Sequence, residues 1–194
     1  MTFTPLETLA AVFGAVSVYL SVKENVWSWP TAIVNVTLYI LVFWRAKLYA
    51  DMALQVVYIG ISVYGWHQWL HGGAGRTALP VTRLTKRVAA ALVGIGAVSV
   101  LLLGTILGRY TDAALPWLDS TTTATSLIAQ WMMAKKILEN WLVWVAVDVV
   151  YIGMFLFKSL TLTAVLYAVF LVLSATGYLQ WKKSLESHAA RAAA

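Results

Sequence analysis

The sequence predicts an all-α integral membrane protein with seven transmembrane helices, and three observations lead to this prediction. The 194-residue chain is 61% hydrophobic and only 11% charged, which is typical of proteins embedded in lipid. Seven apolar segments follow one another, each close to the roughly 20 residues that a helix needs to cross a bilayer. The Lys and Arg residues fall mainly between these segments, where loops in water are expected.

The predicted helices cover residues 6–22, 27–44, 48–70, 88–108, 119–136, 141–157 and 161–181. No basic region precedes the first segment, so it is interpreted as a membrane helix rather than a cleaved signal peptide. The longest connector, residues 70–87, contains glycines and a proline and is predicted to be an irregular surface loop. The tail after Lys183 shows no core-forming pattern and is predicted to fray.

Basic residues distinguish the two sides of the predicted bundle. Ten Lys and Arg residues lie on the side of the carboxyl terminus and four on the other side. The positive-inside rule therefore predicts an external amino terminus and a cytoplasmic carboxyl terminus. This distribution and lipid headgroups account for the net charge of +6, so no nucleic-acid partner is expected. Lys135 and Lys136 are expected to be topology anchors, and Trp27, Trp69 and Trp181 interfacial anchors.

An internal repeat appears when the chain is shifted by 112 residues. The shift places Trp29 on Trp141, Tyr39 on Tyr151, Phe43 on Phe155, and Gly65, Gln68 and Trp69 on Gly177, Gln180 and Trp181. We expect one membrane domain over residues 1–194, with repeat one at 6–70, a linker helix at 88–108 and repeat two at 119–181. Parallel repeats of this 3+1+3 kind place a substrate site near mid-depth between them.

Polar and aromatic side chains form stripes on several of the predicted helices. In the sixth, Asn140, Trp144, Asp148 and Tyr151 share one face, because their spacing follows the helical period. Polar groups in lipid usually face a bundle interior or a cavity. The candidate substrate-binding residues are Asn35, Tyr39, Gln55, Ser126, Gln130, Asn140, Trp141, Trp144, Asp148, Tyr151 and Tyr167.

More than one role stays open for the smaller polar groups and for the carboxylate of Asp148. Ser62, Ser126, Thr163 and Ser174 are the residue types that hydrogen-bond helices to one another, so they are expected to serve packing first. Asp148 fits a proton relay, a counter-ion or one half of a structural hydrogen bond.

Several function classes find no support in the sequence. Cysteine is absent and the three histidines form no ligand cluster, so no metal or other cofactor is expected. No GxxxxGK[ST] motif is present, and no nucleophile–base grouping lies within the spans, which argues against an ATPase and an intramembrane enzyme. A retinal photoreceptor would need a lysine in the seventh span, which has none before Lys182.

The chemistry of the stripes favours a transporter for a small, hydroxylated aromatic solute. Tryptophan faces stack on rings and attract cations, and amides read hydroxyl and carboxamide groups. A nucleoside-like solute, including one with a cationic ring, satisfies both features.

Three motifs resemble the PnuC family of bacterial vitamin transporters. They are QWMMAKKILENWLVWVAVD at 130–148, LYADMALQ at 48–55 and GYLQW at 177–181. The most specific part is the pattern of Gln130 and Trp131, the paired lysines, and Asn140-Trp141-x-x-Trp144. The resemblance covers the chain from Trp27 to Trp181.

The resemblance implies a fold similar to that of full-length sugar transporters of the SWEET type. It also implies transport of nicotinamide riboside by facilitated diffusion across the bacterial inner membrane, with trapping by a cytosolic kinase that phosphorylates the riboside. The Trp-x-x-Trp element favours this substrate over thiamine or riboflavin. The resemblance also implies assembly as a homotrimer. A proton-coupled carrier of a related vitamin or nucleoside, such as thiamine, riboflavin or a deoxynucleoside, is the alternative.

Overall fold

The described part of the chain is almost entirely helical. The computed structural model describes residues 4–45, 49–111, 115–157 and 161–193. Its seven α-helices are α1 (Pro5–Val22), α2 (Ser28–Arg45), α3 (Tyr49–His71), α4 (Lys86–Tyr110), α5 (Pro116–Ala134), α6 (Asn140–Phe157) and α7 (Thr161–Ala193). A 3-10 turn, η1 (Ala74–Arg76), lies in the connector before α4. The all-helical prediction is confirmed, and the helix ends agree with it to within three residues except at the end of α7.

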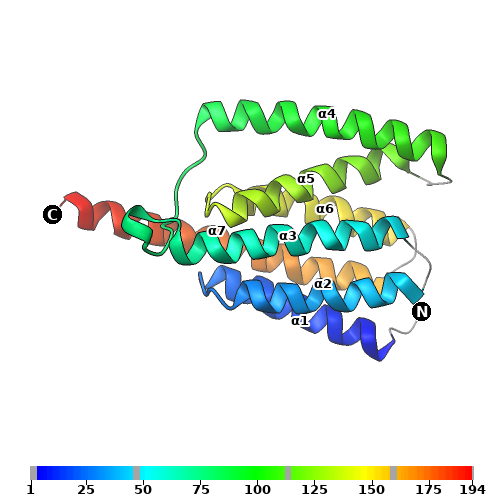
Figure 1. The fold of residues 1–194 in the computed structure, drawn as a ribbon, viewed down its shortest axis with the longest axis horizontal. Coiled ribbons are helices and arrows are strands. Elements are labelled where there is room, and N and C mark those ends of the chain that lie inside the picture. The colour runs from blue at the N-terminus through cyan, green and yellow to red at the C-terminus, as the bar shows by residue number, and fades with distance from the viewer. Residues whose placement is uncertain (1–3, 46–48, 112–114, 158–160, 194) are drawn as a thin grey trace.

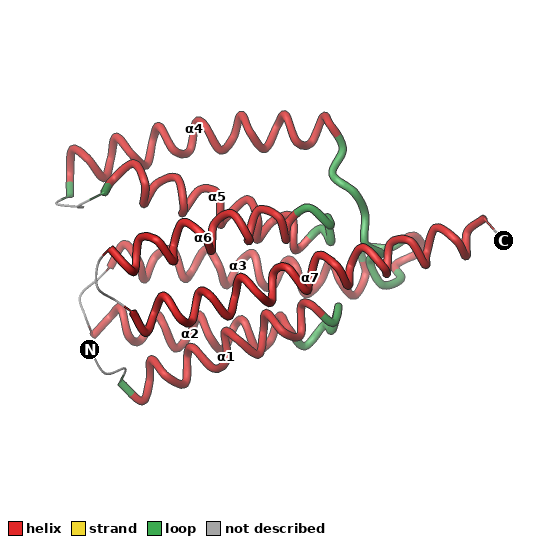
Figure 2. Tube along the Cα trace, turned by 180° about the vertical axis from the view of Figure 1, so that it is seen from behind, coloured by secondary structure: helices red, strands yellow, loops and turns green. Residues whose placement is uncertain are grey.

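The helices run side by side, and α4 stands at one edge of the bundle (Figure 1). We call α1–α3 the first helix set and α5–α7 the second helix set. Within each set, consecutive helices pack together, and α4 packs on α5. Contacts of α1 with α7 and of α3 with α5 join the two sets (Figure 2).

Local signals in the sequence explain where several helices begin. Thr4 caps α1, because its side chain accepts from the Glu7 amide while the Glu7 carboxylate accepts from the Thr4 amide, and Pro5 opens the first turn. The Thr85 side chain caps α4 by accepting from the Val88 amide, and Pro116 opens α5. These caps satisfy backbone donors that have no partner inside the helix.

Two of the helix ends share one geometry. After α1, Glu24 adopts a left-handed backbone (φ 53°), and after α5, Lys136 does the same (φ 48°). The Asn25 amide then donates to Leu20 O, and the Ile137 amide donates to Met132 O. These are helix-terminating turns of the same kind, placed at the same end of the bundle.

The tail of α7 corrects one expectation. Residues after Lys183 were predicted to fray, but α7 continues as a helix to Ala193 and extends beyond the other helices (Figure 1). The segment contains five Ala residues together with Leu, Glu and Arg, which are strong helix formers, so it needs no apolar stripe to remain helical.

The connector before α4 is irregular, as predicted, but it is anchored on the turn between α5 and α6. The Thr82 amide donates to Lys136 O, and the Leu138 amide donates to Thr82 O, both at 2.9 Å. The Leu84 amide donates to the Glu139 carboxylate at 2.8 Å. Val81 is thereby buried against the end of the bundle.

The outer surface of the bundle is apolar, as expected for a protein in lipid. Large hydrophobic side chains such as Val93, Leu101 and Val172 are more than half exposed. Among the described residues, α1, α4, α6 and a stretch of α7 are long and apolar enough to cross a membrane by length and composition. The protein is therefore a multi-pass membrane protein.

Candidate functional site

A cavity of about 420 Å³ lies between the first and second helix sets. All six helices of the two sets contribute to its wall, while α4 contributes nothing to it. The side chains facing it are mainly aromatic, hydroxyl and amide groups. Among the described lining residues there is one carboxylate, from Asp148, and no Lys, Arg or His.

The structure brings ten of the eleven sequence-predicted site residues to this cavity. They are Asn35, Tyr39, Gln55, Ser126, Gln130, Trp141, Trp144, Asp148, Tyr151 and Tyr167. The eleventh, Asn140, is fully buried at the start of α6 and does not line the cavity. Its Nδ2 donates to Ile137 O at 2.6 Å, so this amide holds the turn that precedes α6.

Aromatic rings gather at the end of the cavity away from the turn between α5 and α6. Tyr39 stacks on Phe43, with ring centroids 5.8 Å apart, and Tyr151 stacks on Phe155 at 5.7 Å. Tyr167 contacts Tyr151 at 4.8 Å and Phe155 at 5.0 Å. These rings offer flat faces on which a planar solute can stack.

Two tryptophans form the opposite end of the cavity, which we call the floor. Trp29 and Trp141 line the cavity, and each packs edge-to-face on a second tryptophan behind it. The centroid of Trp29 is 5.4 Å from that of Trp69, and the centroid of Trp141 is 5.4 Å from that of Trp181. Among the described residues, the buried indole N–H groups of Trp29 and Trp141 have no hydrogen-bond partner.

The location of Trp69 and Trp181 overturns their predicted role as interfacial anchors. Their exposed fractions are 3% and 0%, and both belong to the principal hydrophobic cluster. Trp27 is 64% exposed, in agreement with an interfacial position. Lys136, expected to be a topology anchor, is also buried, and its Nζ lies 3.0 Å from Glu24 Oε2.

Hydrogen bonds fix two of the polar groups on the wall. Ser174 Oγ donates to Asp148 Oδ2 at 3.1 Å, joining α7 to α6, and both residues are buried. Asn35 Nδ2 donates to Ala10 O at 2.6 Å, joining α2 to α1. Each of these side chains therefore serves helix packing while it also lines the cavity.

Sequence reasoning missed part of the wall. Ser62 and Ser174 were assigned to helix packing, yet both line the cavity as well. Gly14 and Ser17 of α1 were not considered, because α1 carries few polar residues and shows no stripe. Trp29 was noticed only as one half of a repeated pair, and that pairing with Trp141 was the signal that could have placed it in the site.

The arrangement suits binding and passage of a solute rather than catalysis. In the described part of the chain, no group of three His, Asp or Glu residues is placed to hold a metal ion. The wall offers stacking surfaces, hydroxyls, amides and unpaired indole donors, which are groups that recognise a ring with polar substituents.

Comparison with known proteins assigns this architecture to a family. The sequence pattern of the family described as "Nicotinamide mononucleotide transporter" matches residues 4–183. The nicotinamide riboside transporter PnuC of Escherichia coli K12 is 24% identical, over 96% of this chain and 89% of the relative. The protein of the same name from Neisseria mucosa is 30% identical, over 94% and 74%.

A more distant relative carries a different vitamin. The riboflavin/roseoflavin transporter RibM of Streptomyces davaonensis is 23% identical, over 88% of this chain and 81% of the relative. The fold matches the crystal structure of the vitamin B3 transporter PnuC with a TM-score of 0.75 and 28% identity, covering 94% of this chain and 83% of that one.

Proposed function

This chain belongs to the nicotinamide mononucleotide transporter family, and we propose that it carries nicotinamide riboside across the bacterial inner membrane. The proposal includes facilitated diffusion through the cavity between the two helix sets. A cytosolic kinase that phosphorylates the riboside then retains it in the cell, since the phosphorylated product no longer fits the carrier.

The absence of basic side chains from the described cavity wall is the observation that carries the choice of substrate. A buried phosphate is usually held by Arg or Lys side chains, which offset its charge. The wall supplies instead aromatic faces and a single carboxylate, Asp148. The riboside, with a cationic ring and no phosphate, matches this wall better than the mononucleotide named in the family description.

Individual residues receive roles according to their chemistry. We assign ring stacking to Trp144 and to the cluster around Tyr151 and Tyr167, whose faces line the cavity. The amide and hydroxyl groups of Asn35, Gln55, Ser126 and Gln130 read the ribose and carboxamide, with Tyr39 closing one side and the Trp141 indole donating from the floor. Asn140 acts indirectly, by holding the turn on which Trp141 sits.

The two helix sets correspond to parallel repeats in a SWEET-like 3+1+3 arrangement, with α4 as the linking helix. Geometry that recurs 112 positions apart supports this proposal. Glu24 and Lys136 end equivalent turns, and the Tyr39–Phe43 stack recurs as Tyr151–Phe155. The edge-to-face pair of Trp29 and Trp69 recurs as Trp141 and Trp181, with interplanar angles of 89° and 86°.

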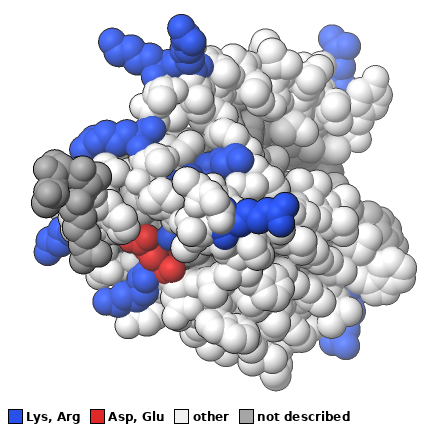
Figure 3. Space-filling view, turned by 60° about the vertical axis from the view of Figure 1, so that its left-hand side comes forward, with Lys and Arg blue, Asp and Glu red and all other residues white. Residues whose placement is uncertain are grey.

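The proposed orientation places the carboxyl-terminal end of the bundle in the cytoplasm. Lys and Arg side chains are spread over this end of the molecule, and acidic ones occupy a small area of it (Figure 3). Such a surface favours the side of the membrane that faces anionic lipid headgroups and the cytoplasm. The resemblance to the family adds assembly as a homotrimer.

Isothermal titration of the purified protein with a panel of vitamins tests the substrate. Nicotinamide riboside should bind more tightly than nicotinamide mononucleotide, thiamine or riboflavin. Trp144→Ala should weaken riboside binding, whereas Trp27→Ala, at an exposed tryptophan, should not. Tighter binding of the mononucleotide would overturn the reasoning from charge, and tighter binding of thiamine or riboflavin would overturn the substrate.

A proton-coupled mechanism is the second candidate, favoured by one observation. Asp148 is a buried carboxylate that reaches the cavity and accepts a hydrogen bond from Ser174, and such groups serve as proton relays in membrane carriers. Counterflow in proteoliposomes, with and without a pH gradient, separates the two mechanisms. Uptake that disappears without the gradient would replace facilitated diffusion by coupling.

A further inference from the structure

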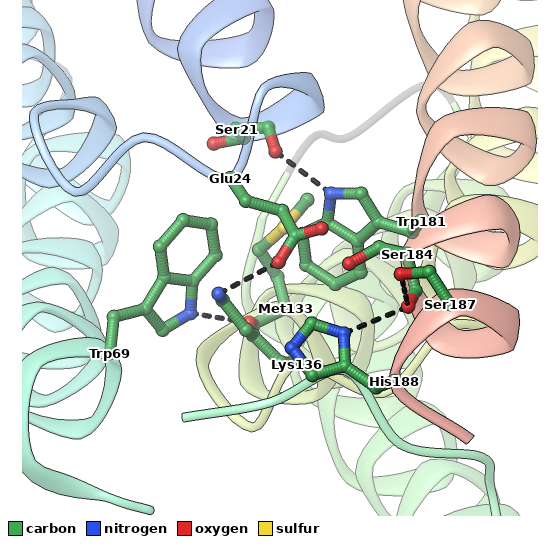
Figure 4. A network of polar contacts seen from close by, with 9 residues as sticks. All are labelled: Ser21, Glu24, Trp69, Met133, Lys136, Trp181, Ser184, Ser187 and His188. Carbon is green, nitrogen blue, oxygen red and sulfur yellow. Dashed lines mark hydrogen bonds and ion pairs between the residues drawn. The ribbon is translucent and has the colours of Figure 1, made fainter. Parts of the chain in front are cut away.

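One end of the cavity is closed by a set of contacts that join the two helix sets, which we call the clasp. The clasp consists of the indoles of Trp69 and Trp181, the carbonyls of Ser21 and Met133 that they reach, and the Glu24–Lys136 ion pair. Trp69 Nε1 donates to Met133 O at 3.1 Å, and Trp181 Nε1 donates to Ser21 O at 3.0 Å (Figure 4). Lys136 Nζ lies 3.0 Å from Glu24 Oε2 in the same view.

The clasp is reciprocal between the two helix sets. Trp69 lies 112 positions before Trp181, and Ser21 lies 112 positions before Met133. Each set therefore gives one indole N–H to the other set and accepts one in return. Glu24 and Lys136 are also 112 positions apart, so the ion pair joins equivalent positions directly.

The carbonyls that accept these bonds lie in the last turns of α1 and α5. Such carbonyls lack the i+4 amide partner that a continuing helix would supply. Ser21 O accepts instead from the Glu24 amide, and Met133 O from the Lys136 amide, both at 3.0 Å. The clasp thus adds a second hydrogen bond to carbonyls that lie where both helices end.

The clasp lies directly behind the floor of the cavity. Trp29 and Trp141 line the cavity, whereas Trp69 and Trp181 form the next layer and do not line it. The two inner indoles also contact each other, with centroids 5.7 Å apart. Beyond them, Lys136 Nζ lies 4.7 Å from the centre of the Trp69 ring. A solute moving out through this end would have to pass both indole layers and the ion pair.

The contacts of the clasp contribute little free energy individually, so they can hold this end closed and still separate. Each hydrogen bond is a single neutral contact, worth about 1 kcal/mol net. The ion pair is partly open to solvent, since 24% of the Glu24 side chain is exposed. When the sets separate, the indole N–H groups, carbonyls and charges can all be hydrated, so opening leaves no group unsatisfied.

We infer that the Trp69–Met133 and Trp181–Ser21 hydrogen bonds, together with the Glu24–Lys136 ion pair, form a gate at this end of the cavity. The gate is closed in this structure, and a solute leaves or enters through this end only when the two helix sets separate there. The inference rests on the proposed transport function for its physiological meaning. The motion itself does not depend on which solute is carried.

Bridging the two helix sets chemically tests this gate. The chain contains no cysteine, so Glu24→Cys with Lys136→Cys places the only two thiols at the ion pair. A short bifunctional methanethiosulfonate should join them in proteoliposomes. Riboside uptake should then fall at least about tenfold and return after reduction, as expected when a required separation is blocked. Each single-cysteine variant should show the same uptake with and without the reagent, because one thiol cannot be bridged.

Uptake that persists in fully bridged protein would overturn the inference. Riboside binding measured on the bridged protein in detergent separates this outcome from failure of the proposed function. If riboside binds neither bridged nor unbridged protein, the proposed substrate is wrong, and the labelling test below decides the gate without a substrate.

Accessibility supplies a readout that needs no substrate. A reporter cysteine at Ser62, which is buried on the cavity wall, should react slowly with a membrane-impermeant maleimide applied from the clasp side. Trp181→Phe keeps a ring and removes only the N–H donor, so labelling should rise about fivefold, the factor that corresponds to one neutral hydrogen bond. Trp69→Phe should do the same.

Two controls make the labelling test specific. Trp27→Phe, at an exposed indole, should leave labelling unchanged. Glu24→Lys alone should raise labelling, and Glu24→Lys combined with Lys136→Glu should lower it again, because the exchange restores the ion pair. If labelling does not change in either Phe variant, or if the charge exchange gives no rescue, the clasp does not control access.

Discussion

Replacing Gly65 by alanine is expected to push Trp29 out of the cavity floor. A Cβ built on Gly65 would lie 2.4 Å from the Trp29 ring, and two further ring atoms lie within 2.7 Å. Carbon atoms in van der Waals contact are about 3.5–4.0 Å apart, so the overlap exceeds about 1 Å. Displacing the ring breaks its packing, because Trp29 is 2% exposed and packs on Trp69.

Gly60 on the same helix provides the control, since a Cβ there would meet nothing within 4 Å. An alanine at either position gains about 1 kcal/mol of helix propensity, so that contribution cancels in the comparison. Overpacking a rigid site costs about 1–3 kcal/mol, and the depth of this overlap places Gly65→Ala at the upper end. We expect its free energy of unfolding to lie about 3 kcal/mol below that of Gly60→Ala.

Two measurements check this expectation. The thermal unfolding midpoint in detergent should be lower for Gly65→Ala than for Gly60→Ala. Riboside binding should weaken about tenfold, or by about 1.4 kcal/mol, because the displaced indole enters the cavity that it now lines. Equal midpoints and equal affinities in the two variants would refute the assigned packing of Trp29 on Gly65.

Three further changes have defined outcomes. Ser174→Ala removes the donor to Asp148 and should lower the free energy of unfolding by about 1–3 kcal/mol, measured by thermal unfolding. Asn35→Ala removes the 2.6 Å bond to Ala10 O and should cost about 1 kcal/mol in the same assay, together with weaker riboside binding. Glu139→Ala removes the acceptor for the connector amide and should speed tryptic cleavage between α3 and α4.

A matched control variant is available for each of these three predictions. Thr176→Ala removes an exposed hydroxyl on the same helix as Ser174 and should not change the unfolding midpoint. If it lowers the midpoint as much as Ser174→Ala does, the hydrogen bond to Asp148 does not stabilise the protein specifically. Thr37→Ala, at an exposed hydroxyl on the helix of Asn35, is the matched control for Asn35→Ala and should change neither stability nor riboside binding. Glu186→Ala, at an exposed site on α7, should not change cleavage of the connector, and unchanged cleavage in Glu139→Ala would show that this carboxylate does not hold it.

The positions of the helices could be predicted from the sequence, because a lipid bilayer restricts what a membrane-spanning segment can be. Each span must be apolar and long enough to satisfy its own backbone, so the predicted segments coincide closely with the helices observed. The tail of α7 escaped this rule because it extends beyond the bundle, where helix propensity rather than an apolar pattern decides. The cap at Thr4, with Glu7 three residues later, was also present in the sequence as a recognisable pattern.

The wall of the cavity was predictable where a helix carries a dense polar stripe and unpredictable where it does not. The stripe on α6 gave Trp144, Asp148 and Tyr151, all of which line the cavity. The wall contributed by α1 depends on small residues such as Gly14, whose location follows from packing against α2 rather than from its own chemistry.

The locations of the tryptophans were the hardest to predict from the sequence. Trp69 and Trp181 lie near predicted span ends, where an interfacial position is the usual outcome. Two glycines, Gly65 and Gly177, leave room for the rings of Trp29 and Trp141. Trp69 and Trp181 pack against those two rings and are buried as a result. Such a fit between distant positions cannot be deduced from the spacing of residues along one helix.

The long seventh helix makes motion at the clasp visible from outside the membrane. Trp181 is part of α7, and the same unbroken helix continues to Ala193, a length of about 18 Å at the usual rise per residue. If α7 tilts as a rigid body at the clasp, its displacement grows with distance along the helix and is largest near Ala193. A spin label on the exposed Glu186 would report that swing without touching the passage through which the vitamin travels.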